Sequence, residues 1–149
     1  MAFDRKDFYA RTMHTPDTPE RAELRSALRN VSKALLPLHR RLIDVTKDDY
    51  EFAFAPVASP SQLLQLVTND GFFAWLKPIT SLIVDIDEMA RTDFEPAQAD
   101  AIAARLEQLF GASPAPEFAE RYFALLQRDA DVTIGHAALR KAIMALRRG

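Results

Sequence analysis

Residues 18–50, TPERAELRSALRNVSKALLPLHRRLIDVTKDDY, decide the fold. The stretch opens with Thr18, Pro19 and Glu20, which supply an N-cap residue, a proline at the first helical position and an acid in the first turn. Apolar residues then recur at alternating intervals of four and three, so they share one helical face: Leu24, Leu28, Val31, Leu35, Leu38, Leu42 and Val45. The pattern predicts a long first helix that ends near Tyr50.

Helical signals continue after this stretch. Residues 59–60, Ser-Pro, predict the start of a short helix, and Asn-Asp-Gly at 69–71 predicts a break after it. A further helix is expected over residues 72–91, FFAWLKPITSLIVDIDEMAR. The spacing of Thr and Glu in residues 92–95 is that of a capping box. It predicts the start of another amphipathic helix, which Gly111 ends.

The connector, the prolines and the last region need separate interpretation. Residues 50–56 read as a connector whose aromatic side chains tuck under the bundle. Pro37 and Pro78 fall on outward helix faces, where the carbonyl that loses its partner can be hydrated, so we expect each proline to bend its helix rather than break it. Residues 116–147 form either one helix or two helices separated at 129–131.

These patterns predict an all-α protein, a mostly antiparallel bundle of four to five helices with a long first helix and proline-bent helices. No strand signal competes. A chain of 149 residues matches one ordinary domain. We therefore expect an N-terminal tail at residues 1–17 and a single helical-bundle domain at residues 18–149.

Composition excludes several classes of function. A formal charge of −2 gives no field that would attract nucleic acid or an anionic membrane. The absence of cysteine removes disulfides, thiolate nucleophiles and cysteine-ligated metals. The amino end lacks the apolar centre of a signal peptide, and no apolar run approaches the ~20 residues that span a bilayer, so we expect a cytoplasmic protein that does not cross a membrane.

Motifs for cofactors and metals are missing as well. The chain has no nucleotide-binding loop, no dinucleotide-binding turn and no serine hydrolase elbow. The Glu-x-x-His pairs of di-iron bundles do not occur. No cofactor and no metal is therefore expected, and an enzyme is the less favoured interpretation.

Two polar residues beside the apolar faces are candidate catalytic groups. His39 is bordered by apolar residues of the first helix, and Asp87 is expected to begin at a buried seam of the 72–91 helix. A buried acid needs a partner or a raised pKa, and Arg91, one turn later, can supply the partner. Where the two seams face each other, His39 and Asp87 form either a structural polar pair or an acid–base pair. His136 is expected to be a hydrogen-bonded core residue.

An apolar group at the start of the 72–91 helix is the candidate ligand-binding site. Bundle interiors can hold a flat or apolar ligand, with polar contacts here from Asp87 or His39, although such side chains more often fill the core. Trp75 is the residue most expected to lie at an edge. The candidate residues are Phe72, Phe73, Trp75 and Leu76.

Residues 59–66, SPSQLLQL, and residues 73–88, FAWLKPITSLIVDIDE, resemble a family of uncharacterised bacterial all-helical proteins. The resemblance covers about residues 59–90. It implies a bacterial and cytoplasmic setting. It carries no activity, cofactor or functional residue to this chain.

Apolar residues in excess of the core faces point to a covered surface. A homodimer is the simplest explanation for them. The favoured function is therefore a non-catalytic bundle that self-associates or docks a protein partner, and the alternatives are a binder of a small apolar or aromatic ligand and an enzyme that uses His39 and Asp87. The excess residues include Leu36, Ile43, Phe73, Val84, Ile134 and Met144.

Overall fold

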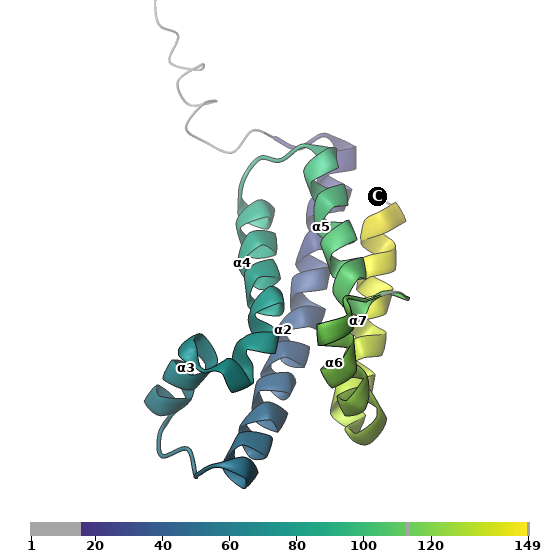
Figure 1. Ribbon diagram of the computed structural model, residues 1–149. Helices are drawn as coiled ribbons and strands as arrows, with labels where there is room; N and C mark the ends of the chain where they lie inside the picture. Colours follow the sequence, from purple (N-terminus) through teal and green to yellow (C-terminus); the bar gives the residue numbers. More distant parts are fainter. Residues whose placement is uncertain (1–15, 113, 149) are drawn as a thin grey trace, which may run out of the picture.

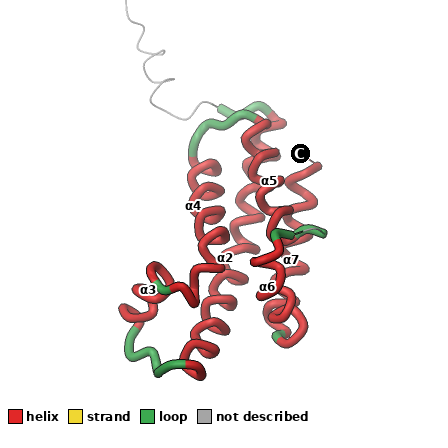
Figure 2. Tube along the Cα trace, viewed as in Figure 1, coloured by secondary structure: helices red, strands yellow, loops and turns green. Residues whose placement is uncertain are grey.

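The structure is a computed structural model that describes residues 16–112 and 114–148. Within these ranges the chain is helical and contains no strand (Figure 2), which confirms the expected all-α class. Most of the expected tail, residues 1–15, lies outside the described residues. The elements are α2 (Pro19–Ala53), α3 (Pro60–Asn69), the 3₁₀ helix η1 (Gly71–Leu76), α4 (Lys77–Arg91), α5 (Pro96–Phe110), α6 (Pro116–Arg128) and α7 (Ala130–Arg148).

The long first helix forms as the sequence predicts. The Thr18 hydroxyl oxygen accepts a hydrogen bond from the Arg21 amide at 3.2 Å, and Pro19 occupies the first helical position. All seven apolar residues of the predicted face are buried. Pro37 lies inside α2 on an exposed face, as expected. The helix ends at Ala53, slightly beyond the expected end.

Adjacent long helices run antiparallel (Figure 1). His39 of α2 contacts Thr80 of α4. Arg25 lies 14 residues before His39 and contacts Phe94, which lies 14 residues after Thr80. The chain from α4 to Phe94 therefore runs opposite to α2. On the other flank of α2, α7 runs in the opposite direction too. The helices α5 and α6 follow one another along α7 (Figure 1), so the pair occupies the fourth position of the bundle.

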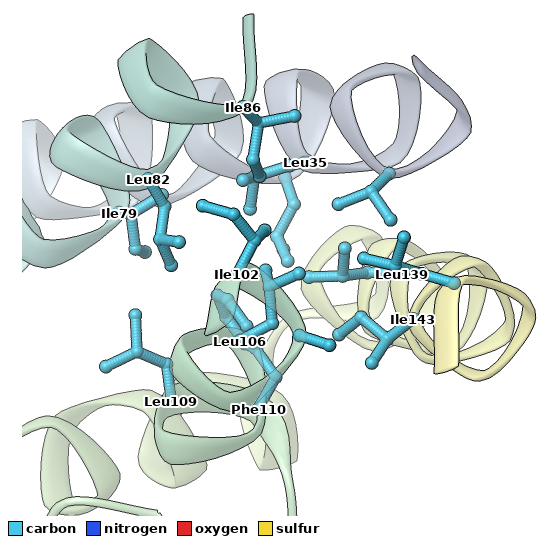
Figure 3. Close-up of a cluster of buried hydrophobic side chains, with 14 of the residues drawn as sticks. Leu35, Ile79, Leu82, Ile86, Ile102, Leu106, Leu109, Phe110, Leu139 and Ile143 are labelled. Atoms are coloured by element: carbon cyan, nitrogen blue, oxygen red, sulfur yellow. The ribbon is translucent and has the colours of Figure 1, made fainter. Parts of the chain in front are cut away.

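The core lies where α2, α4, α5 and α7 meet (Figure 3). Each of these helices contributes side chains that are at most 3 % exposed. Burying such a side chain stabilises the fold by about 1.5–3 kcal/mol relative to leaving it in water. Examples from the four helices are Leu35, Ile79, Leu82, Ile86, Ile102, Leu106, Leu139 and Ile143.

The region expected as one bent helix over residues 72–91 is two segments of different helix type. The Asp70 carboxylate accepts a hydrogen bond from the Phe72 amide at 2.8 Å and caps η1. The α-helix α4 begins at Lys77, so Pro78 sits in its first turn instead of its interior. Proline is favoured there because its missing N–H would have no helical partner. Pro78 therefore marks a change of helix type, and the predicted bend inside an α-helix is wrong.

The expected burial of the aromatic connector is wrong for Phe52 and Phe54, whereas Tyr50 packs against the core. The α2 helix continues through residues 50–53, and Phe52 and Phe54 are 97 % and 66 % exposed. Tyr50 packs on Phe73 with ring centroids 5.8 Å apart. Because a helix turns about 100° per residue, Phe52 points about 200° away from Tyr50 and faces solvent.

The capping box lies one turn later than predicted. The Glu95 amide donates to the Gln98 side chain at 2.7 Å, and the reciprocal bond of the box is present as well. Thr92 instead follows the last residue of α4, and its hydroxyl donates to the Glu88 carbonyl at 3.0 Å. Gly111 ends α5 as expected.

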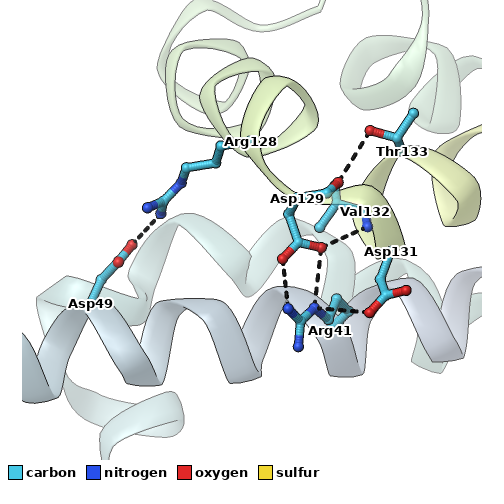
Figure 4. Close-up of polar contacts among 7 residues, drawn as sticks. All are labelled: Arg41, Asp49, Arg128, Asp129, Asp131, Val132 and Thr133. Atoms are coloured by element: carbon cyan, nitrogen blue, oxygen red, sulfur yellow. Dashed lines mark hydrogen bonds and ion pairs between the residues drawn. The ribbon is translucent and has the colours of Figure 1, made fainter.

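The last region forms two helices, separated at Asp129 (Figure 4). The Asp129 carboxylate accepts a hydrogen bond from the Val132 amide at 3.0 Å, so it caps the start of α7. The same carboxylate forms a 2.6 Å ion pair with Arg41 of α2, while Asp131 lies 3.7 Å from that guanidinium. The hydrogen bond from Arg41 lowers the pKa of Asp129. The break is thus held against the long helix.

Candidate functional site

His39 is paired with a threonine. Its Nε2 lies 3.2 Å from the Thr80 hydroxyl across the α2–α4 contact. Burial lowers the pKa of His39, because a low-polarity environment disfavours the imidazolium. The Thr80 hydroxyl donates to the Leu76 carbonyl at 3.4 Å, so we assign the Nε2–H of the neutral ring as the donor to the hydroxyl oxygen. This is the structural polar contact between helices that was expected, with a different partner.

Asp87 is not buried, which corrects the sequence-based expectation. Its side chain is 60 % exposed and forms an ion pair with Arg91 at 3.1 Å, as predicted for residues one turn apart. Asp87 lies seven residues after Thr80, about 10 Å further along α4. His39 and Asp87 are therefore not brought together. The pair required by the enzyme hypothesis does not form.

The four candidate ligand-binding residues divide into two groups. Phe73 and Leu76 are 0 % and 1 % exposed and belong to the core, so they line no accessible site. Phe72 and Trp75 line a pocket of about 200 Å³ between α2, η1 and α6. Neither His39 nor Asp87 lines this pocket, contrary to expectation. We call this space the Trp75 pocket. Its other lining residues come from α2 and α6 and are Thr46, Asp49, Arg121, Ala124, Leu125 and Arg128.

Two arginines of α6 line the Trp75 pocket. The Arg121 guanidinium lies over the Phe72 ring, with Cζ 5.5 Å from the centroid. Such a contact holds a cation in place by attraction to the face of the ring. Arg128 is engaged differently, because its Nη2 donates to the Asp49 carboxylate at 2.7 Å (Figure 4).

The indole of Trp75 has an unpaired donor. Its ring packs on Phe118 with centroids 5.6 Å apart. The Nε1 atom is buried and has no hydrogen-bond partner within the described part of the chain. An unpaired buried donor costs about 1–3 kcal/mol. The sequence predicted that Trp75 lies at an edge, and the half-buried side chain agrees with that prediction.

A buried tyrosine explains the setting of His136. The Tyr122 hydroxyl lies 2.8 Å from His136 Nδ1, with Phe110 and Phe118 against the tyrosine ring. Burial raises the pKa of Tyr122, while burial and the Arg140 charge lower the pKa of His136. The phenol therefore donates to a neutral imidazole. The expectation of a hydrogen-bonded histidine is confirmed.

Sequence reasoning missed Arg25, whose side chain is 7 % exposed. Its guanidinium forms two hydrogen bonds with Asp17, at 2.7 and 2.9 Å. It also donates to the carbonyls of Ala90 and Thr92, each at 2.8 Å, at the end of α4. These bonds identify a structural arginine. The only signal available in the sequence was an arginine directly after Leu24 on the helix.

Apolar side chains remain uncovered on α2 and its two neighbours. A groove of about 740 Å³ between α2 and α4 is lined by Leu36 and Val84, which are 48 % and 58 % exposed. A second groove, of about 460 Å³, lies between α2 and α7 and is lined by Leu36 and Ile134. Leu36 thus borders both grooves. Of the residues expected in excess of the core, Phe73 is fully buried, and Ile43 is half-buried and packs against the core.

The described residues contain no group of three or more histidine, cysteine, aspartate or glutamate side chains able to hold a metal ion. No helix in that part of the chain combines the length and the apolar character needed to span a bilayer. Comparison of the chain with protein-family models, curated proteins and solved structures finds no match. The family resemblance over residues 59–90 and a bacterial origin therefore stay predictions.

Proposed function

We propose that this protein is a non-catalytic helical bundle that associates with a second copy of itself through the groove between α2 and α4. One observation carries the proposal: Leu36 and Val84, both about half exposed, face the same groove from the two helices. Covering these side chains removes apolar surface from water, which is the main driving force for association. We call this surface the α2–α4 face.

Charges on the α2–α4 face are arranged for self-association. Arg29 and Lys33 lie within about 60° of Leu36 around α2, and Glu88 lies within about 60° of Val84 around α4. Because the helices are antiparallel, the basic and acidic groups lie at the same end of the groove. None of these three side chains forms an ion pair within the described residues.

A twofold axis along the groove makes these groups complementary. It places α2 of one copy over α4 of the other at the same height, so Leu36 meets Val84 of the second copy. Arg29 and Lys33 then meet Glu88 of the second copy. A surface that matches itself in this way is what a twofold dimer requires.

Light scattering coupled to size-exclusion chromatography tests the proposal. We expect a dimer that dissociates on dilution. Leu36→Glu should give a monomer with unchanged helical content, because it introduces a charge into the covered groove. Leu64→Glu is the matched control, because Leu64 is an exposed leucine on α3 that does not line the groove. A monomeric native protein, or equal masses for the two variants, would overturn the proposal.

Charge exchange tests the geometry of the dimer. Glu88→Lys should weaken association by bringing like charges together, and Lys33→Glu should do the same. Combining the two substitutions should restore much of the affinity, since the pair is reversed. Sedimentation equilibrium measures each dissociation constant. A double variant no tighter than the single variants would show that Lys33 and Glu88 do not meet across the axis.

A further inference from the structure

We propose that the Trp75 pocket binds a small carboxylate with a flat apolar body, such as an aromatic monocarboxylate. The pocket lies between α2, η1 and α6, away from the α2–α4 face. The proposal is therefore independent of self-association. Size, wall chemistry and charge of the pocket each restrict the ligand.

The volume limits the ligand to fragment size. At about 200 Å³, the Trp75 pocket is smaller than the ~300–1,000 Å³ of pockets that hold drug-sized ligands. A single ring with one short substituent suits such a space. Larger metabolites with several rings do not.

The walls favour a flat apolar body. Phe72 and Trp75 present aromatic surface, and Ala124 and Leu125 of α6 present aliphatic surface. Aromatic rings pack on one another in tilted or offset arrangements worth about 0.5–1.5 kcal/mol beyond their burial. A planar ring in this pocket gains such contacts from the aromatic lining.

The charge of the lining selects an anion. Two arginines and one aspartate line the pocket, and the aspartate, Asp49, is already paired with Arg128. This leaves Arg121, whose guanidinium lies over the Phe72 ring and whose side chain forms no hydrogen bond or ion pair within the described residues. A guanidinium presents several N–H groups in a planar fork, which matches the two oxygens of a carboxylate.

Trp75 lines the same pocket as this cation and carries a neutral donor. Its Nε1 is buried in a residue that lines the pocket, so the indole must rotate before a ligand oxygen reaches this atom. The cost of leaving that donor unpaired in the free protein favours the rotation, because the ligand removes the cost. A carboxylate can accept from Arg121 with one oxygen and from Trp75 with the other.

NMR of the indole tests the proposal directly, because the chain has one tryptophan and therefore one indole N–H signal. The probe is 4-fluorobenzoate, and 4-fluorobenzyl alcohol is its neutral match. We expect a saturable downfield shift of the indole signal with the carboxylate, and binding at least tenfold weaker with the alcohol. No saturable shift with the carboxylate, or equal binding of the two probes, would overturn the proposal.

Two variants test the role of Arg121. Arg121→Met should abolish the preference for the carboxylate, while Arg147→Met, at an exposed arginine on α7, makes the same change of net charge and should leave the preference intact. Both substitutions lie at exposed positions, so both proteins should fold. A carboxylate preference that survives Arg121→Met would show that Arg121 does not bind the carboxylate, and a preference lost equally in both variants would assign it to net charge. Either result would overturn the site.

Discussion

Arg25 shows how one polar side chain can join three parts of the chain. Its guanidinium connects α2 to Asp17 before that helix and to the carbonyls at the end of α4. It also lies over the Phe94 ring, 5.0 Å from the centroid. The terminal carbonyls of a helix lack partners within the helix, and Arg25 provides them.

Arg25→Met should destabilise the protein by about 3 kcal/mol, because it removes the charged group that bonds both the Asp17 carboxylate and the carbonyls at the end of α4. Urea denaturation at fixed protein concentration measures the change. Arg21→Met, one turn earlier on α2, is the control and should cost less than about 0.5 kcal/mol. Similar costs for the two variants would mean that the Arg25 contacts add little net stability.

The neutral histidines predict a pH dependence of stability. Burial lowers the pKa values of His39 and His136 below the usual 6.5. As pH falls, these histidines therefore take up protons at a higher pH in the unfolded chain than in the folded protein. The free energy of unfolding should therefore be highest above about pH 6.5 and decrease as pH falls toward the folded pKa values. Urea titrations from about pH 7.5 to 5.5 measure the slope. His136→Gln should reduce it, and a native profile without slope would contradict the prediction.

At the scale of elements, the two outward prolines, Pro37 and Pro78, affect their helices differently, and the reason is local. Pro37 lies on the exposed face of a helix whose other face is a long apolar stripe, and α2 continues through it. Pro78 follows Asp70, which starts a 3₁₀ turn whose hydrogen bonds run to the third residue back. The periodicity of residues 72–91 is compatible with both arrangements, so the sequence pattern could not separate them.

Gly135 of α7 lies where this helix approaches α2 closely. A Cβ atom placed there would lie 3.2 Å from Leu38 Cδ1 and 3.4 Å from Leu38 Cβ, and Leu38 is buried in α2. Gly135→Val should therefore destabilise the protein by about 2 kcal/mol through overpacking. This cost outweighs the gain in helix propensity that comes from replacing a glycine within a helix. Ala138→Val, at an exposed position of the same helix, is the control and should cost less than about 1 kcal/mol. Thermal or urea unfolding compares the variants, and equal costs would argue against a close helix contact.

At the scale of the whole molecule, stability is unevenly distributed. No residue of α3 is fully buried, and its principal contact is with η1, whereas α2 contributes ten buried residues. We expect the amides of α3 to exchange with solvent at least about a hundredfold faster than those in the middle of α2. Hydrogen exchange read by NMR measures this ratio. Equal protection would show that α3 opens only when the bundle unfolds.

The sequence by itself determined the helices and their inward faces. The seven apolar residues of α2 were identified correctly, because the 3.6-residue period of a helix is a local property. The cap at Thr18 and the stop at Gly111 were likewise local. Hydrogen bonds between near neighbours in the chain set both.

Only the tertiary structure decided which polar groups meet. His39 pairs with Thr80 and not with Asp87 because the register between α2 and α4 depends on how two apolar faces interlock. The same packing places Trp75 beside α6 and leaves Leu36 uncovered. Such contacts join residues far apart in the chain, and no local pattern specifies them.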